Sequence, residues 1–142
     1  MKVQRILHYP GSKWRIADWI ISFFPEHETY LEPFFGSGAV LFSKEPSALE
    51  TINDIDGEVI NLFNIIRERP EEIARAIELT PHARDEYYKS YEPAENDLER
   101  ARRLIVRLWQ GRGGKDSSQD WVALHGGMQW STAWSRVVKV PR

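Results

Sequence analysis

The chain has 142 residues, of which 42% are hydrophobic and 28% charged, and its formal net charge at pH 7 is −2. This length can bury a hydrophobic core, and the absence of cysteine excludes disulfides and thiolate metal sites. Its four histidines show no metal-ligand spacing and no apolar run reaches about 18 residues, so we expect a cytoplasmic protein without a metal or a membrane span.

The first predicted element is a helix that follows a turn at Tyr9-Pro10-Gly11-Ser12-Lys13, with Ser12 well placed to cap it. Apolar residues recur on one face of this helix until Pro25 ends it: Ile16, Trp19, Ile20, Phe23 and Phe24. Lys13 lies in the first turn, where the helix dipole favours anions. It is therefore either an ordinary surface lysine or a residue with a task such as binding a ligand carboxylate.

The most informative stretch is a short apolar run that ends in a carboxylate and enters a glycine-rich loop, Tyr30-Leu31-Glu32-Pro33-Phe34-Phe35-Gly36-Ser37-Gly38. This order predicts a strand that opens into a loop before a helix at about residues 39–44. Nucleoside-bearing ligands bind at such strand ends, and Gly36 and Gly38 allow a ligand to approach the backbone closely. A phosphate-binding loop would carry a lysine here, so the acidic Glu32 favours a cationic ligand.

A second short strand is predicted at residues 51–54, and it also ends in a carboxylate. Asp54 follows Glu32 by 22 positions, close to the ~20-residue spacing of an acidic residue that binds ribose hydroxyls. A carboxylate suits a vicinal diol because it accepts two hydrogen bonds. An isolated aspartate is more often a turn residue or helix cap, and Asp56 competes for the cap. The glycine-rich loop at the right distance favours the ribose role.

Three further helices are expected as scaffold in the middle of the chain. The first runs from Asp56 to Arg67 and has apolar residues on more than one side. The second starts at Pro70, because proline and the two following glutamates suit a first helical turn. The third starts at Thr80-Pro81 and runs toward Tyr91.

The two ends of the chain differ in charge. Residues 1–99 carry 10 Lys/Arg and 19 Asp/Glu, a net charge of −9, whereas residues 100–142 carry 9 and 2, a net charge of +7. An amphipathic helix is predicted from Asp97 to Trp109, with arginines opposite its apolar stripe, and a basic glycine-rich segment follows. The basic side chains either contact nucleic-acid phosphates or form a solvated face paired with Glu95 and Glu99. Composition alone favours neither interpretation.

The last segment, residues 116–142, contains Trp121, Trp130 and Trp134 without a regular period. Tryptophans in such a segment pack a small loop-rich subdomain more often than they stack on unpaired bases. Packing is therefore the favoured interpretation.

Three of these segments, in this order, resemble the DNA adenine methyltransferase family of adenine-specific (N6) DNA methyltransferases. The first is Tyr9–Lys13, the second is Glu32–Gly38, and the third is Ile52–Asp56 followed by Glu58–Asn64. The resemblance covers roughly residues 6–115. It implies an α/β protein with a partial Rossmann-like S-adenosylmethionine-dependent methyltransferase fold and an added helical, loop-ended recognition region. Residues 1–68 would form the cofactor-binding part and residues 69–142 the DNA-recognition region.

The resemblance also implies roles for individual residues. Tyr9 would contact S-adenosylmethionine by its ring, and Lys13 would pair with the methionine carboxylate. Glu32 and the glycine loop would surround the sulfonium end, while Asp54 would hold the ribose beside Ile55 and the adenine. The full implied cofactor site is Tyr9, Pro10, Gly11, Ser12, Lys13, Glu32, Pro33, Phe34, Gly36, Ser37, Gly38, Asp54 and Ile55. The implied contacts to double-stranded DNA are Arg100, Arg103, Arg107, Arg112 and Lys115.

The sequence departs from the family pattern at the catalytic tetrapeptide, Asp/Asn-Pro-Pro-Tyr/Phe, because no two consecutive prolines occur in it. We therefore predict no catalytic residue here and expect the amino-terminal half of a methyltransferase, marginal alone or completed by a catalytic segment or by self-association. The alternative is a non-catalytic module that binds cofactor or DNA. A nicotinamide-dinucleotide enzyme is a weaker alternative, since Leu41 stands where a third glycine belongs.

Overall fold

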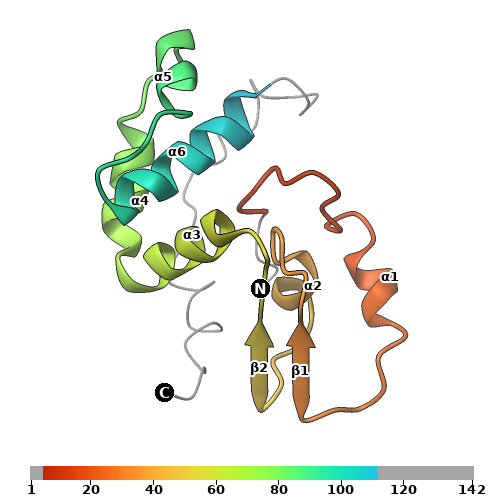
Figure 1. Cartoon of the computed structure of the whole chain (residues 1–142). Helices are drawn as coiled ribbons and strands as arrows, with labels where there is room; N and C mark the ends of the chain where they lie inside the picture. Colours follow the sequence, from red (N-terminus) through yellow and green to blue (C-terminus); the bar gives the residue numbers. More distant parts are fainter. Residues whose placement is uncertain (1–4, 112–142) are drawn as a thin grey trace. The chain divides into compact units, whose positions relative to one another are not determined.

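The computed structural model describes residues 5–111, which divide into two compact units, each considered by itself (Figure 1). The first unit, described from residue 5 to Ile55, contains α1 (Ala17–Ile21), β1 (Thr29–Glu32), α2 (Ala39–Ser43) and β2 (Leu49–Ile52). The second, described from Asp56 to residue 111, contains α3 (Gly57–Glu68), α4 (Pro70–Glu78), α5 (Arg84–Lys89) and α6 (Asp97–Gln110). The chain is thus a mixed α/β protein.

The sheet of the first unit is a parallel pair, in which Thr29 is opposite Leu49 and Glu32 is opposite Ile52. The helix α2 forms the crossover between the strands, as parallel neighbours require. Hydrogen bonding continues past the strands, because Asn53 N–H donates to the Glu32 carbonyl at 2.9 Å. The predicted strand ending at Glu32 is therefore confirmed, whereas the second strand lies two residues earlier than the predicted 51–54, so Asp54 follows the strand instead of ending it. Both carboxyl ends lie at one edge of the pair (Figure 1).

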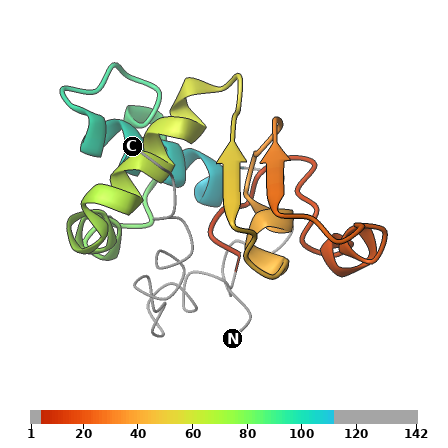
Figure 2. The same cartoon turned by 90° about the horizontal axis from the view of Figure 1, so that it is seen from below.

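The core of the first unit is built around α2, which lies on one side of the strand pair (Figure 2). Four successive α2 residues are buried, because this short helix packs on more than one side: Ala39, Val40, Leu41 and Phe42. The Phe42 ring lies 6.1 Å from that of Phe35 and is stacked on Trp14 at 6.5 Å. Leu31 on β1, by contrast, is 59% exposed, so the strands present apolar surface on the side away from this core.

The helix predicted after Ser12 is shorter than expected, and its predicted cap is wrong. α1 begins after Ile16, which makes no side-chain capping bond, and it ends at Ile21. Ser12 is engaged elsewhere, with the hydroxyl of Ser37, and so cannot cap this helix. Trp19 and Phe23 remain 62% and 68% exposed, with their rings edge to face at 5.0 Å. In this segment, helical apolar spacing therefore did not predict burial.

The second unit is helical, and most of its boundaries match the predictions. The Asp56 side chain accepts a hydrogen bond from Glu58 N–H at 2.9 Å and caps α3, while Pro70 opens α4. The helix predicted from Thr80 begins only at Arg84. The long helix α6 packs against α3, α4 and α5. Their shared core contains Val59, Leu62, Phe63, Ile66, Ile73, Ala101, Leu104, Ile105 and Trp109.

The packing of the chain divides between Ile55 and Asp56. The predicted functional division after residue 68 stays a prediction. Within residues 5–111, no helix combines the length and the apolar character needed to span a bilayer. Arg112, Lys115 and the three tryptophans of residues 116–142 lie outside the described part of the chain.

Candidate functional site

The glycine-rich loop between β1 and α2 adopts backbone conformations that require glycine. Gly36 and Gly38 have φ angles of 51° and 69°, in the left-handed region that other residues rarely adopt. A Cβ atom at Gly38 would lie 2.5 Å from both the Phe35 and the Phe42 ring. A Cβ atom at Gly36 would lie 3.2 Å from the Tyr9 ring. The loop thus folds tightly over the aromatic core and has the Tyr9 ring against its backbone.

Segments that are far apart in the sequence converge on this loop. The hydroxyls of Ser12 and Ser37 are 2.8 Å apart, and Ser37 is buried. The Gly36 N–H donates to Oδ2 of Asp54 at 2.7 Å. Together with the contact of Tyr9 on Gly36, these bonds bring the turn at residues 9–13, the glycine loop and the end of β2 into one cluster. The predicted proximity of the three segments is therefore present in the fold.

Glu32 ends β1 beside this loop. Its Oε2 accepts hydrogen bonds from the Tyr30 hydroxyl at 3.0 Å and from the Leu41 N–H in α2 at 3.1 Å. Burial raises the pKa of Glu32 to about 7, against the lowering effects of these two bonds and of the Lys44 charge. No ion pair neutralises the Glu32 carboxylate within residues 5–111. A half-buried carboxylate without a bonded cation is well suited to receive a cationic ligand.

A cavity of about 510 Å³ opens beside Glu32, a size typical of small-molecule sites. Four of the predicted site residues line it: Lys13, Glu32, Pro33 and Phe34. The remaining walls are largely apolar and come from the α1 segment, β1 and α2, including Ile20, Phe24, Tyr30 and Val40. Asp54, Gly36, Ser37 and Gly38 do not line this cavity. The predicted residues therefore form two adjoining groups, one at the loop and one at the cavity, and both include residues of the segment 32–38.

The other predicted cofactor residues are mostly exposed. The Lys13 ammonium donates to the Gly11 carbonyl, which folds this side chain back over its own turn. Pro10 is exposed, Phe34 is 86% exposed and Ile55 is 97% exposed. Single exposed apolar side chains are common on protein surfaces, so this exposure alone does not indicate a ligand. Within residues 5–111, no cluster of three or more histidine or acidic side chains is placed to hold a metal ion.

The α6 arginines predicted to contact DNA are held within the second unit. Arg100 pairs with Glu58 on α3 at 2.7 Å and with Asp97 at 2.8 Å. Arg103 pairs with Glu99 at 2.8 Å and donates to two carbonyls of the preceding loop, at 2.8 and 3.0 Å. In this structure these side chains have partners within the second unit, including Glu99, which the alternative interpretation named.

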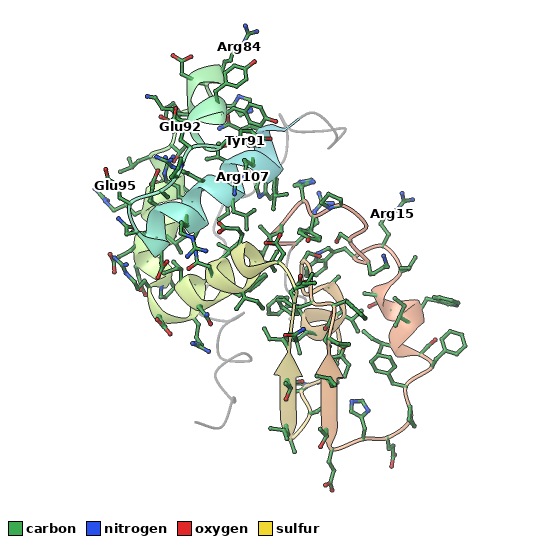
Figure 3. The ribbon with its side chains drawn as sticks, viewed as in Figure 1. Arg15, Arg84, Tyr91, Glu92, Glu95 and Arg107 are labelled. Atoms are coloured by element: carbon green, nitrogen blue, oxygen red, sulfur yellow. The ribbon has the colours of Figure 1, made fainter. Side chains whose placement is uncertain are left out.

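Arg107 is likewise engaged. It donates to the Ser90 carbonyl, and its guanidinium carbon lies 5.6 Å from the centre of the Tyr91 ring. Figure 3 shows Arg107 on α6 close to Tyr91, whereas Glu95 and Arg84 extend away from the helices. These contacts tie α6 to the loop after α5. The predicted DNA contacts of Arg100, Arg103 and Arg107 stay a prediction.

Sequence reasoning missed two residues of the Glu32 environment, Tyr30 and Lys44. Tyr30 had a signal, because residues two apart on a strand share one face and Tyr30 precedes Glu32 by that spacing. Lys44 had none, since a lysine after a short helix is ordinarily solvated. It is only 2% exposed, because it pairs with Glu50 on β2 at 2.5 Å.

The profile of one family matches most of the described residues. The family of D12 class N6 adenine-specific DNA methyltransferases matches residues 9–111. The chain is 28% identical over 117 residues to the DNA adenine methylase of Escherichia coli (strain K12), and the match covers 80% of this chain and 42% of that protein. It is 31% identical over 120 residues to the DNA adenine methylase of Haemophilus influenzae (strain ATCC 51907 / DSM 11121 / KW20 / Rd), with the same shares.

A third relative carries a different name. The chain is 30% identical over 112 residues to the Type II methyltransferase M1.LlaDCHI of Lactococcus lactis subsp. cremoris, and the match covers 70% of this chain and 38% of that protein. The chain therefore spans about two fifths of the length of the curated relatives it matches.

Proposed function

Because this chain belongs to the family of D12 class N6 adenine-specific DNA methyltransferases, we propose that it is the S-adenosylmethionine-binding part of a site-specific DNA adenine N6-methyltransferase. The observation that carries this proposal is the convergence of Tyr9, Ser12 and Asp54 on one glycine loop. Glu32, which ends the strand before that loop, lines a cavity of about 510 Å³. A family profile alone would not require these segments to meet.

The residues present fit the chemistry of this cofactor. S-adenosylmethionine has a positively charged sulfonium and amino group, which suit the half-buried Glu32 carboxylate, and a carboxylate, which suits Lys13. Asp54 would hold the ribose, because a carboxylate has lone pairs for further donors beside Gly36 N–H. The Tyr9 ring and the exposed Ile55 would contact the cofactor, the latter beside the adenine. When bound, the cofactor supplies the methyl group.

The fold we propose for this part is Rossmann-like. The support is the β1–α2–β2 unit, a parallel pair with a helical crossover whose loop at the carboxyl end of β1 holds the predicted ligand residues. Leu41 donates its N–H to Glu32 from the position of the third glycine in a dinucleotide loop. This use of Leu41 favours a carboxylate-centred site over a nicotinamide-dinucleotide enzyme.

Double-stranded DNA is the proposed substrate partner of the complete activity. The target adenine would leave the base stack, because its exocyclic nitrogen is not reached in line inside the duplex. The residues proposed to contact DNA remain Arg100, Arg103, Arg107, Arg112 and Lys115. The first three already donate to partners within the second unit, and because a guanidinium has five N–H donors, a phosphate oxygen would either use a remaining donor or replace one of these partners.

The catalytic tetrapeptide would come from a segment other than these 142 residues, since they contain no two consecutive prolines. The same fact supports a second candidate, a non-catalytic cofactor- or DNA-binding subunit that needs a separate catalytic chain. A methylation assay on adenine-containing duplex, with and without a polypeptide carrying Asp-Pro-Pro-Tyr, tests whether the chain takes part in methyl transfer at all. Activity only with that polypeptide supports a cofactor-binding part of a methyltransferase, whether the catalytic segment belongs to the same chain or to a separate one. Cofactor or DNA binding without activity in either case supports a non-catalytic remnant.

The cofactor assignment is tested by calorimetric titration of S-adenosylmethionine into the chain and into an Asp54→Asn variant. We expect affinity to fall by about 1–2 kcal/mol, because asparagine keeps one acceptor but loses the charge and the second acceptor. Asp56→Asn is the matched control, since asparagine caps α3 as well as aspartate does and affinity should not change. Equal affinity of all three proteins would remove Asp54 from the site.

A further inference from the structure

Tyr30 lies on β1 two residues before Glu32, and its hydroxyl is bonded to the Glu32 carboxylate. Tyr30 and Glu32 share one face of the strand, and both line the cavity. The Tyr30 hydroxyl and the Leu41 N–H both donate to the same oxygen of Glu32, Oε2, at 3.0 and 3.1 Å. No donor in residues 5–111 is bonded to the other oxygen, Oε1. The two bonds therefore hold the carboxylate by one oxygen and leave the other for a ligand.

The Tyr30 ring is itself in contact with Lys44, the residue that follows α2. The Lys44 ammonium lies 4.5 Å from the ring centre, in cation–π geometry. This ammonium donates to Glu50 at 2.5 Å, to Ser47 at 2.8 Å and to the Glu45 carbonyl at 2.8 Å. Because an ammonium has three donors and each has an acceptor here, Lys44 fixes the ring and has no N–H left for a ligand.

We propose that Tyr30 is a positioning residue, which holds Glu32 through Oε2 so that Oε1 faces the positively charged end of the bound cofactor. This inference rests on the proposed function and adds to it the residue that orients the carboxylate. Tyr30 belongs to none of the three segments that carry the family resemblance. Its role follows from its hydroxyl bond, its place on the cavity wall and the fixed cation behind its ring.

The Tyr30 bond also influences the charge of the carboxylate. Burial raises the pKa of Glu32 to about 7, while the Tyr30 hydrogen bond favours the ionised form and lowers the pKa. The other ionisable groups near Tyr30 and Glu32 are Lys44 and Glu50, and Lys13 and His27 line the same cavity. Burial, and then the charge of Glu32, raise the pKa of Tyr30 itself, so this hydroxyl remains a donor at neutral pH.

The predicted consequence is a pH-dependent affinity for the cationic cofactor. Cofactor binding favours ionised Glu32, so affinity rises as the pH increases through about 7 and then levels off. Removal of the Tyr30 hydroxyl raises the pKa of Glu32 further. The rise in affinity is then displaced to higher pH, and a smaller loss persists at high pH because the carboxylate is no longer aimed.

The test is calorimetric titration of the full chain with S-adenosylmethionine between pH 6 and pH 9, for wild type and Tyr30→Phe. Phenylalanine keeps the ring over Lys44 and removes only the hydroxyl. We expect affinity roughly tenfold weaker at pH 7 and roughly threefold weaker at pH 9. Tyr91→Phe is the matched control, because it removes an exposed tyrosine hydroxyl in the second unit and should leave the profile unchanged.

The possible outcomes separate this inference from the proposed function. Wild type that binds no S-adenosylmethionine at any pH overturns both. Wild type that binds, together with a Tyr30→Phe profile of the same shape and midpoint, overturns only the role of Tyr30. Incorporation of a more acidic fluorinated tyrosine at position 30 gives a change of opposite sign: as a stronger donor, it should move the midpoint to lower pH. An unmoved midpoint there also contradicts the inference.

Discussion

The two units place the same kind of side chain, a glutamate, in opposite environments. In the helical unit, Glu99 receives Arg102 at 2.7 Å and Arg103 at 2.8 Å, and these hydrogen bonds lower its pKa to about 2. In the strand-containing unit, Glu32 receives a phenol and an amide but no bonded cation, and burial raises its pKa to about 7. The Glu99 carboxylate is neutralised by arginines of its own chain, whereas the desolvation of Glu32 is not offset by a bonded cation within residues 5–111, and a cationic ligand would offset it.

The contrast extends to the arginines. Arg102 also pairs with Glu86 at 3.1 Å and donates to Thr80 at 3.0 Å, so a single side chain links α6 to α5 and to the end of α4. Charged networks of this kind are typical of scaffold, in which the charges fix helices relative to one another. A carboxylate left unmatched at a strand end beside a cavity is typical of a ligand site. The difference lies in the partners rather than in the residue type.

The largest expected effect on the free energy of unfolding is seen by comparing one glycine from each unit, Gly38 and Gly57. Gly38→Ala would bring a Cβ to 2.5 Å from two aromatic rings at a φ of 69°, so we expect a loss of about 2–4 kcal/mol in the free energy of unfolding. At Gly57, in the first turn of α3, a Cβ would meet nothing within 4 Å. Gly57→Ala should therefore be neutral or slightly stabilising. Urea unfolding of both variants checks this, and equal destabilisation would contradict the loop geometry.

The next largest effect on stability is expected at Glu99, whose carboxylate is paired with two arginines. Glu99→Gln should lower stability at pH 7 by about 1–2 kcal/mol, because two arginines lose their ionised partner. The folded-state pKa of Glu99 lies below its ordinary value of 4.5, so its contribution is present above that pH and is lost as the pH falls toward 2. Urea unfolding at several pH values should show the variant and wild type converging in acid. A constant difference down to pH 2 would count against the ion pairs.

The contribution of Glu32 to stability should change with pH in the opposite direction to that of Glu99. The folded-state pKa of Glu32 lies above its ordinary value of 4.5, so the folded state binds more protons and stability falls as the pH rises from about 4.5 to about 7. Glu32→Gln removes this fall and still accepts from Tyr30 and Leu41. We expect a gain of about 1 kcal/mol at pH 8. A loss of stability at pH 8 in urea unfolding would show that the ionised Glu32 carboxylate has stabilising partners in the folded protein.

The smallest expected effect on stability is seen by comparing two arginines of the helical unit, Arg107 and Arg84. Arg107→Ala removes the bond to the Ser90 carbonyl and the contact with the Tyr91 ring, so we expect a loss of about 0.5–1 kcal/mol. Arg84 is exposed and extends away from α5 (Figure 3). Arg84→Ala should stay within about 0.5 kcal/mol of wild type. If thermal unfolding ranks the two variants in the reverse order, Arg107 does not tie α6 to its neighbours.

The sequence predicted the parts of the fold that depend on local signals. Asp56 and Pro70 mark the starts of α3 and α4, because a cap and a first-turn proline act within a few residues. The strand, loop and helix around Glu32 were likewise predicted from the order of apolar residues and glycines. The proximity of Asp54 to the loop was predicted from spacing, and the structure adds the specific bond to Gly36.

The features of the fold and site that were not predicted depend on contacts between residues distant in the sequence. Ser12 was predicted to cap a helix, but its hydroxyl bonds to Ser37, which is 25 positions away. The burial of Lys44 could not be predicted, because only the fold places Glu50 against it. The arginines of α6 were compatible with DNA contact or internal pairing, and only the positions of Glu58 and Glu99 decide which partners they have here.

The central claim is that the Glu32 carboxylate is the group left open for a cationic methyl donor. The most direct test is calorimetric titration of S-adenosylmethionine at pH 8 into wild type, Glu32→Gln and Glu99→Gln. Both variants replace one half-buried glutamate by its neutral isostere, one in each unit. We predict that wild type and Glu99→Gln bind with equal affinity and that Glu32→Gln loses at least tenfold, about 1.4 kcal/mol. Equal binding by all three proteins, or loss in Glu99→Gln alone, would contradict the account.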